Sequence, residues 1–265
     1  MQATELAERN FDGHLRQNAY PGRGLVIGRS SVNDDCLMIY WIMGRSENSR
    51  NRRFVADGGV LKTEPVDLSR VKDPSLIIYE AMLELPGVFK HFPGRHELYA
   101  HSRTTSLPSI YLVSNGAQTR GLYGALQKGG DFDEEMARWE REPDAPNFTP
   151  RITGMLDLHG QRAAITLSIL KANPADPNLT DRTTFRPALP PAGMGLGLTT
   201  YRGDGNPLPC FQGDPLLLPC NRDAAGVLDL YWNALNPDNR ISLAVKRIPA
   251  RGGQGEILIR NRFGG

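Results

Sequence analysis

An arginine-rich segment is the first feature of this sequence that suggests binding chemistry. The stretch GRSENSRNRR, residues 44–53, sets four arginines against the single carboxylate of Glu47. The four are Arg45, Arg50, Arg52 and Arg53. Guanidinium groups bind phosphate oxygens in bidentate fashion and stay charged at any working pH. The segment therefore predicts a phosphate site, although a solvated, salt-bridged surface loop is the alternative interpretation.

Glycines flank a further arginine upstream, in the stretch from Pro21 to Gly28. These glycines precede an expected strand instead of linking a strand to a helix, so they do not form a dinucleotide-binding motif. Their permissive backbone would let Arg23 approach a ligand closely. A simple tight turn is the alternative.

The stretch SNGAQT, residues 114–119, ends an expected strand and leads into an expected helix. The first N–H groups of a helix have no partners within it, so this junction suits a carboxamide or an oxyanion. The side chain of Asn115 would add a donor. An Asn-Gly turn with a polar cap explains the same residues without a ligand.

Carboxylates and prolines lie close together between residues 140 and 151. Glu140, Glu142 and Asp144 precede the stretch APNFTPR, whose two prolines fix the backbone on either side of Asn147 and Thr149. A fixed backbone is what the positioning of a reacting group requires. A rigid connector whose carboxylates face water is the alternative.

No metal site is expected from the histidines. His91, His96 and His101 recur every five residues, which matches neither a helix face nor alternate strand positions. The sequence also lacks the GxSxG, P-loop and HExxH motifs.

Strands dominate the elements that must position these residues. Apolar runs bounded by Gly, Asn or Asp predict strands near 24–28, 37–43, 54–56, 60–66, 76–83, 109–114, 152–158, 163–170, 196–201, 240–247 and 256–262, the second buried on both faces. Helices are expected near 4–17, 118–127 and 132–141, and after a cap at Asn221. The pattern favours two stacked sheets with helices outside, in one domain over 1–265. The proline-rich stretch 173–191 is expected to be a long surface loop.

Composition restricts the partners. The 265 residues carry a formal net charge of +2, too small to attract a polyanion over the whole surface, so nucleic-acid binding is not expected. No stretch approaches the roughly 20 apolar residues of a membrane helix, and residues 1–10 do not resemble a signal region. We expect a cytoplasmic protein without membrane attachment. Whether it forms a homo-oligomer stays open.

Four motifs in one order resemble the archaeal-type IMP cyclohydrolase family and its bacterial relatives. They are PGRGLVIGRS at 21–30, YWIMGRSENSRNRRF at 40–54, LVSNGAQT at 112–119 and APNFTPRI at 145–152. The resemblance implies a four-layer αββα sandwich of two mainly antiparallel sheets, similar to N-terminal nucleophile (Ntn) hydrolases but without their nucleophile. Gln2 after the initiator methionine agrees with that. Insertions near Pro86–Arg103 and Asn173–Pro191 depart from the shorter archaeal pattern, which leaves substrate identity and assembly open.

The resemblance also implies a reaction. It is the cofactor-independent closure of the purine ring of 5-formamidoimidazole-4-carboxamide ribonucleotide to give IMP. The catalytic residues expected are Tyr79, Asn115, Glu140, Asp144 and Arg151, and those expected to bind substrate or its phosphate are Arg23, Arg45, Arg50, Arg52 and Asn147. Two alternatives remain: an amide hydrolase acting on a formylated or ring-opened nucleotide, and a non-catalytic purine nucleotide-binding protein.

Overall fold

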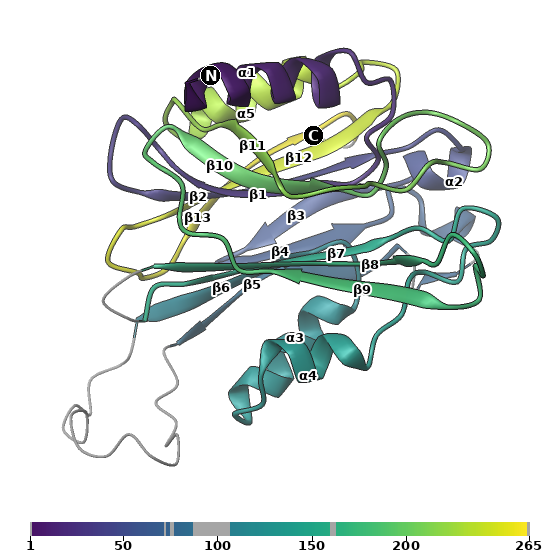
Figure 1. Cartoon of the computed structure of the whole chain (residues 1–265), viewed down its shortest axis with the longest axis horizontal. Coiled ribbons are helices and arrows are strands. Elements are labelled where there is room, and N and C mark those ends of the chain that lie inside the picture. Colours follow the sequence, from purple (N-terminus) through teal and green to yellow (C-terminus); the bar gives the residue numbers. More distant parts are fainter. Residues whose placement is uncertain (1, 72, 75–76, 87–106, 160–162, 264–265) are drawn as a thin grey trace.

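Two antiparallel sheets stacked face to face form the centre of the molecule (Figure 1). The computed structural model describes residues 2–71, 73–74, 77–86, 107–159 and 163–263. Within them, helices cover the outer face of each sheet, so the layers run helix, sheet, sheet, helix. The expected αββα sandwich of two mainly antiparallel sheets is confirmed, whereas the likeness to N-terminal nucleophile hydrolases stays a prediction.

The first sheet has six described strands in the order β11-β10-β1-β2-β12-β13. Their bounds are β1 (Gly24–Arg29), β2 (Cys36–Met43), β10 (Met194–Thr199), β11 (Leu216–Pro219), β12 (Arg240–Ile248) and β13 (Glu256–Asn261). The second sheet has seven, in sequence order from β3 to β9. These are β3 (Arg53–Asp57), β4 (Val60–Glu64), β5 (Tyr79–Pro86), β6 (Pro108–Ser114), β7 (Arg151–Asp157), β8 (Ala164–Ala172) and β9 (Thr180–Phe185).

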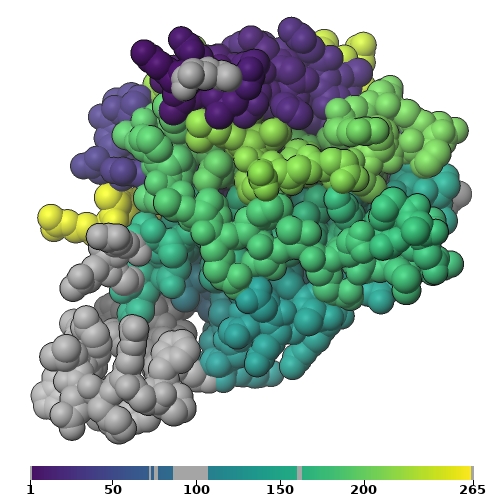
Figure 2. All heavy atoms as spheres, viewed as in Figure 1, coloured from purple at the N-terminus to yellow at the C-terminus, as the bar shows by residue number. Residues whose placement is uncertain are grey.

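Helices α1 (Ala3–Phe11) and α5 (Ala224–Ala234) cover the first sheet, and α3 (Gln118–Gln127) and α4 (Phe132–Ala137) cover the second (Figure 1). A π-helical turn, Asp12–Arg16, continues α1, and two short turns, α2 (Glu47–Arg50) and a 3-10 turn at Leu68–Arg70, follow β2 and β4. The chain passes from the second sheet to the first between β9 and β10. In the space-filling view, the green segment from β9 to β11 lies on the face turned to the viewer (Figure 2).

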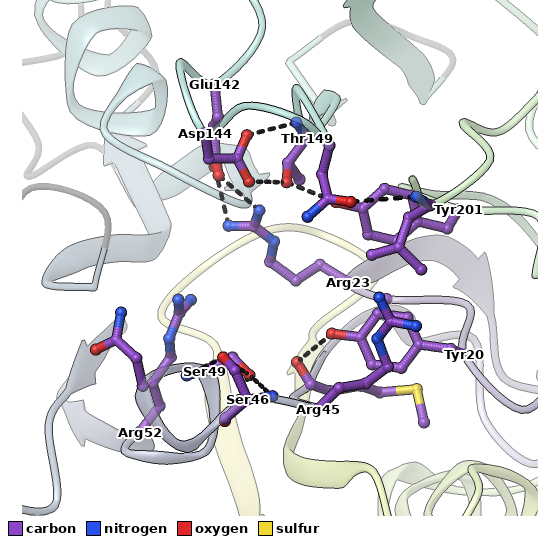
Figure 3. Close-up of a pocket in the computed structure, with 15 residues that line it drawn as sticks. Tyr20, Arg23, Arg45, Ser46, Ser49, Arg52, Glu142, Asp144, Thr149 and Tyr201 are labelled. Carbon is purple, nitrogen blue, oxygen red and sulfur yellow. Dashed lines mark hydrogen bonds and ion pairs between the residues drawn. The ribbon is translucent and has the colours of Figure 1, made fainter. Parts of the chain in front are cut away.

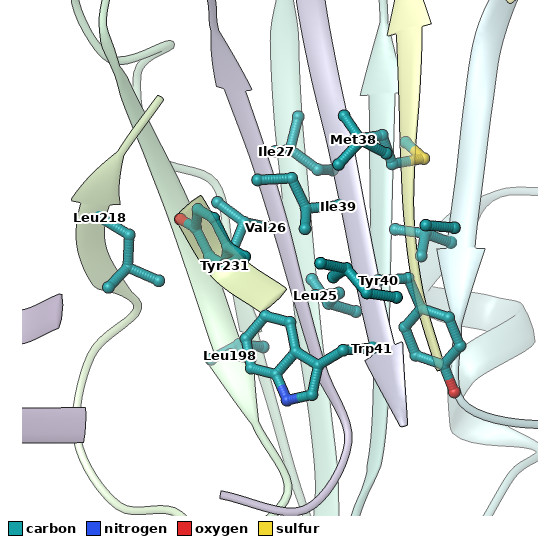
Figure 4. Close-up of a cluster of buried hydrophobic side chains, with 14 of the residues drawn as sticks. Leu25, Val26, Ile27, Met38, Ile39, Tyr40, Trp41, Leu198, Leu218 and Tyr231 are labelled. Carbon is teal, nitrogen blue, oxygen red and sulfur yellow. The ribbon is translucent and has the colours of Figure 1, made fainter. Parts of the chain in front are cut away.

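Strand β2 is buried along its whole length, as its unbroken apolar run predicts. Alternate side chains point to opposite faces of a strand. Trp41 therefore packs against Tyr231 of α5, with ring centroids 6.0 Å apart (Figure 4). Its neighbour Tyr40 faces the second sheet and packs against Phe54, at 5.4 Å. Strand β2 thus contributes side chains both to the core under α5 and to the core between the two sheets.

Several boundaries differ from those expected. The segment expected to be a loop at 173–191 contains β9, whose sequence TDRTTF is polar and only half-buried, so it lacks the apolar alternation of other strands. The short strand β11 was not expected, and the strand expected at 76–83 is β5, which begins at Tyr79. The helix after residue 131 ends at Ala137. Helix α5 is capped by Asp223, whose carboxylate accepts from the N–H of Gly226 at 2.8 Å, and not by Asn221.

A membrane-spanning helix would need a long apolar stretch, and no helix in the described part of the chain has one.

Candidate functional site

A cavity of about 280 Å³ opens at the end of the sandwich where β1 begins and β2 ends. This volume is close to the lower limit of small-molecule sites, about 300 Å³. Figure 3 shows two groups of side chains facing each other across it. One group follows β2 and consists of Arg45, Ser46, Asn48, Ser49 and Arg52. The other includes Arg23, Glu142, Asp144, Asn147, Thr149 and Tyr201.

The first wall is shaped by the one-turn helix α2. Ser46 caps it, because its hydroxyl accepts from the N–H of Ser49 at 3.2 Å while the Ser49 hydroxyl accepts from the N–H of Ser46 at 2.9 Å. The turn places Arg45 and Arg52 in the cavity wall. The Nε atom of Arg52 is buried and finds no hydrogen-bond partner among the described residues. Because Arg45 and Arg52 line this wall, it can bind an anion through guanidinium groups.

Arg50 is directed away from the cavity, unlike the other arginines expected to bind substrate. Its Nε donates to the carbonyl of Gly44 at 3.1 Å, and Nη2 donates to that of Asp238 at 3.4 Å. It lines a separate surface hollow with Asp67 and Phe263. The structure thus brings together Arg23, Arg45 and Arg52 but not Arg50.

Arg23 and Glu142 form a buried ion pair in the opposite wall. Nη1 and Nη2 of Arg23 donate to the two carboxylate oxygens of Glu142 at 2.9 and 2.7 Å, and the residues are 8% and 4% exposed. Gly22 makes this possible, since its φ of +73° is left-handed and a Cβ there would lie 2.2 Å from Oγ1 of Thr200. The glycine turn therefore serves to bring Arg23 into the wall.

A hydrogen-bonded chain of three side chains lies beside this pair. The carboxylate of Asp144 accepts from the N–H of Thr149 at 2.6 Å and from its hydroxyl. Because the carboxylate can only accept, the Thr149 hydroxyl donates to it, and Tyr201 then donates to the Thr149 oxygen at 2.5 Å. Burial raises the pKa of Tyr201, so its hydroxyl keeps its proton at neutral pH. The chain Tyr201–Thr149–Asp144 can pass a proton from the cavity to a carboxylate.

Asn115 does not touch the cavity, which corrects the direct contact expected of it. Its side chain is fully buried and engaged within the protein: the amide nitrogen donates to the carbonyl of Pro150 at 2.8 Å, and the amide oxygen accepts from the N–H of Ile152 at 2.8 Å. Its main-chain carbonyl accepts from Nη1 of Arg23 at 3.1 Å. Asn115 therefore supports Arg23 from behind.

Glu140, Arg151 and Tyr79 also lie outside the cavity wall. The Glu140 side chain is exposed, and only its carbonyl takes part, accepting from Nε of Arg151 at 2.8 Å. Nη1 of Arg151 lies 3.9 Å from Oε1 of Glu142, so this arginine sits behind the ion pair, and burial lowers its pKa. The Tyr79 hydroxyl is 2.7 Å from that of Tyr40 between the sheets. Asp144 and Asn147 do lie in the wall.

Sequence reasoning missed several residues of the cavity. Glu142 lies between Glu140 and Asp144 but is not among the predicted site residues, and neither are Tyr20 and Tyr201. The two tyrosine rings stack with centroids 6.0 Å apart, and the Arg45 guanidinium lies 4.9 Å from the Tyr20 ring. The position of Tyr201 at the end of an expected strand was the available signal.

Among the residues that the structure describes, no group of three or more His, Cys, Asp or Glu side chains could hold a metal ion. His91, His96 and His101 lie outside the described residues.

The family of the chain is identified by comparison with family models. A family model described as IMP cyclohydrolase-like protein matches residues 20–252, a range that includes every residue lining the cavity. No curated protein matches the chain.

Proposed function

Since this chain belongs to the IMP cyclohydrolase-like family, we propose that it converts 5-formamidoimidazole-4-carboxamide ribonucleotide to IMP by dehydrative ring closure. Both reacting groups are on one imidazole ring. The carboxamide nitrogen attacks the formyl carbon, and one of its protons moves to the formyl oxygen, giving a cyclic carbinolamine. The hydroxyl then leaves with the proton of the former formamide nitrogen as water, and the C–N double bond of the purine forms.

The observation that carries this proposal is the two-sided cavity in a chain of this family. One side offers the guanidinium groups of Arg45 and Arg52, and the other offers an acid–base chain beside the ion pair of Arg23 and Glu142. The proposed substrate carries a phosphate at one end and two uncharged reacting groups, the formamide and the carboxamide, at the other. It therefore needs an anion-binding wall on one side and an acid–base wall on the other. Arg45 and Arg52 would bind the 5′-phosphate.

The second side would carry the chemistry. Tyr201, Thr149 and Asp144 would accept the carboxamide proton and return it, help that is typically worth about 10²–10⁴ in rate. Arg23 would stabilise the negative charge that develops on the formyl oxygen, which for one preorganised donor is worth about 10²–10³. Glu142 would hold Arg23 in place, because it bonds both terminal nitrogens.

Three of the residues expected to be catalytic become positioning residues in this proposal. Asn115 and Arg151 would act through Arg23 and Glu142, which they contact. Tyr79 and its hydrogen-bond partner Tyr40 would act on Arg23, with whose charge both interact electrostatically. Glu140 has no part in the proposed reaction, since its carboxylate is on an exposed residue outside the cavity.

The test is incubation of the purified protein, in the absence of added metal, with the formamidoimidazole carboxamide ribonucleotide, with the product identified by mass. We expect IMP at an enzymic rate and no formate. Release of formate would indicate an amide hydrolase instead, and tight binding of IMP without turnover would indicate a nucleotide-binding protein. The Arg23→Ala variant should reduce turnover by at least about 10²-fold, since it removes the guanidinium in the reacting half of the cavity.

A further inference from the structure

A hairpin reaches from the first sheet to the mouth of the cavity. Tyr201 pairs with Cys210 at its base, where the N–H of Arg202 also donates to the carbonyl of Pro209 at 3.0 Å. We call residues 202–209 the cavity hairpin. One of them, Leu208, is 7% exposed and lines the cavity. The tip of the cavity hairpin, around Asp204, is exposed.

Three contacts hold the cavity hairpin to opposite walls of the site. On the reacting side, the N–H of Leu208 donates to the side-chain oxygen of Asn147 at 3.1 Å. On the arginine side, Nη1 of Arg45 forms an ion pair with Asp204 and donates to the carbonyl of Gly205 at 3.1 Å. Nη1 of the guanidinium expected to bind phosphate is therefore already occupied by a carboxylate and a carbonyl of the same chain.

We propose that Asp204 is an internal competitor of phosphate, and that a nucleoside monophosphate binds by displacing this carboxylate from Arg45 and releasing the tip of the cavity hairpin. This inference rests on the proposed function, from which it takes Arg45 as a phosphate ligand. Nη1 of Arg45 has two N–H donors and gives them to Asp204 and Gly205, so a phosphate that binds through this nitrogen must displace the carboxylate. A phosphate carries more charge and more acceptor oxygens than a carboxylate, and so displaces it.

The competition is modest in size. The Arg45 and Asp204 side chains are 35% and 48% exposed, and exposed ion pairs contribute little because solvent screens them. Removing the competitor should therefore strengthen phosphate binding by about two- to fivefold. A ligand without phosphate gains nothing, because it does not need Arg45. Asp204 would thus reduce affinity for phosphate-bearing ligands alone and make product release easier.

The first experiment compares the wild-type protein with Asp204→Asn and with Asp214→Asn, which removes an exposed carboxylate shortly after the cavity hairpin. Calorimetry measures the dissociation constants of IMP and of inosine, and thermal unfolding verifies that the variants are folded. We expect Asp204→Asn to bind IMP about two- to fivefold more tightly, with inosine unchanged and Asp214→Asn equal to wild type. Unchanged or weaker IMP binding by Asp204→Asn would overturn the inference, and so would an equal gain for inosine.

Hydrogen exchange supplies a second measurement. IMP should accelerate exchange of the backbone amides at 203–206 in the wild type, the reverse of the protection that a bound ligand usually gives, whereas inosine should not. Protection of these amides by IMP would overturn the release step. Turnover of the open-ring nucleotide by the same wild-type preparation separates the role of Asp204 from the proposed function. Normal turnover without the expected changes in IMP affinity and hydrogen exchange rejects only the role of Asp204. Absence of both turnover and IMP binding rejects the proposed function as well.

Discussion

The guanidinium of Arg23 is bonded to both carboxylate oxygens of Glu142, at 2.9 and 2.7 Å, although the two residues are 119 positions apart in the chain. Arg23 directly precedes β1 of the first sheet, and Glu142 precedes β7 of the second. The pair therefore joins the two halves of the sandwich at the cavity, and it lends itself to a test that separates stability from catalysis.

Glu142→Leu should lower the free energy of unfolding by about 3–5 kcal/mol, because it leaves the buried charge of Arg23 without a partner. The double variant Arg23→Met/Glu142→Leu should recover most of that loss, since two apolar side chains replace the whole pair. Turnover should stay at least about 100-fold below wild type in both. Urea unfolding and a turnover assay make the comparison, and a double variant no more stable than the single one would show that the two charges are not coupled.

Tyr201→Phe should reduce turnover by about 10²–10⁴ while leaving IMP binding within about threefold of wild type, because only the first hydroxyl of the proton chain is lost. Tyr231→Phe is the matched control. That hydroxyl is also buried and donates to a carbonyl, that of Pro219, but far from the cavity in the layer of α5. Steady-state kinetics of both variants are decisive: equal turnover in the two would exclude the chain as a proton path.

Arg52→Ala should weaken IMP binding by about 10- to 100-fold, the effect of losing one charge-assisted hydrogen bond. Arg50→Ala should change it by less than about twofold, since Arg50 faces away from the cavity although it is only two residues distant. Calorimetric titration with IMP tests both. A stronger effect of Arg50→Ala than of Arg52→Ala would reverse the assignment of the phosphate wall.

Gly22→Ala should destabilise the fold by about 1–3 kcal/mol or more, because the new Cβ would meet Oγ1 of Thr200 at 2.2 Å and Cδ2 of Tyr201 at 2.5 Å in a left-handed backbone conformation. Gly124→Ala should instead stabilise it by about 0.5–1 kcal/mol. Gly124 lies within α3, where a Cβ has no described atom within 4 Å and alanine favours the helix. Urea midpoints for the two variants should therefore move in opposite directions.

Apolar periodicity predicted most of the fold. The strands of both sheets that alternate or are wholly apolar, β2 above all, were found near their expected positions. Strand β9 was missed because half-buried polar residues form it, and its place at the sheet edge is decided by pairing with β8. Such pairing is a tertiary property that a local pattern does not contain.

The site was predictable in its chemistry but not in its geometry. The sequence located the arginine segment and the carboxylate segment, yet it could not decide which member of each points inward. Glu142 faces Arg23 because its N–H pairs with the carbonyl of Thr149 at 2.9 Å, a contact that closes the intervening loop. The stack of Tyr20 on Tyr201 joins residues that are 181 positions apart and has no local signature.

The division of the cavity between two sheets has a consequence for refolding. A chain in which each sheet has formed but the two have not docked would have native strand content and every site residue, yet it would have no working site. Recovery of activity should therefore lag behind recovery of the far-ultraviolet signal of the strands and coincide with burial of Tyr40 and Phe54 between the two sheets. Activity in this protein would thus act as a probe of the last step of assembly.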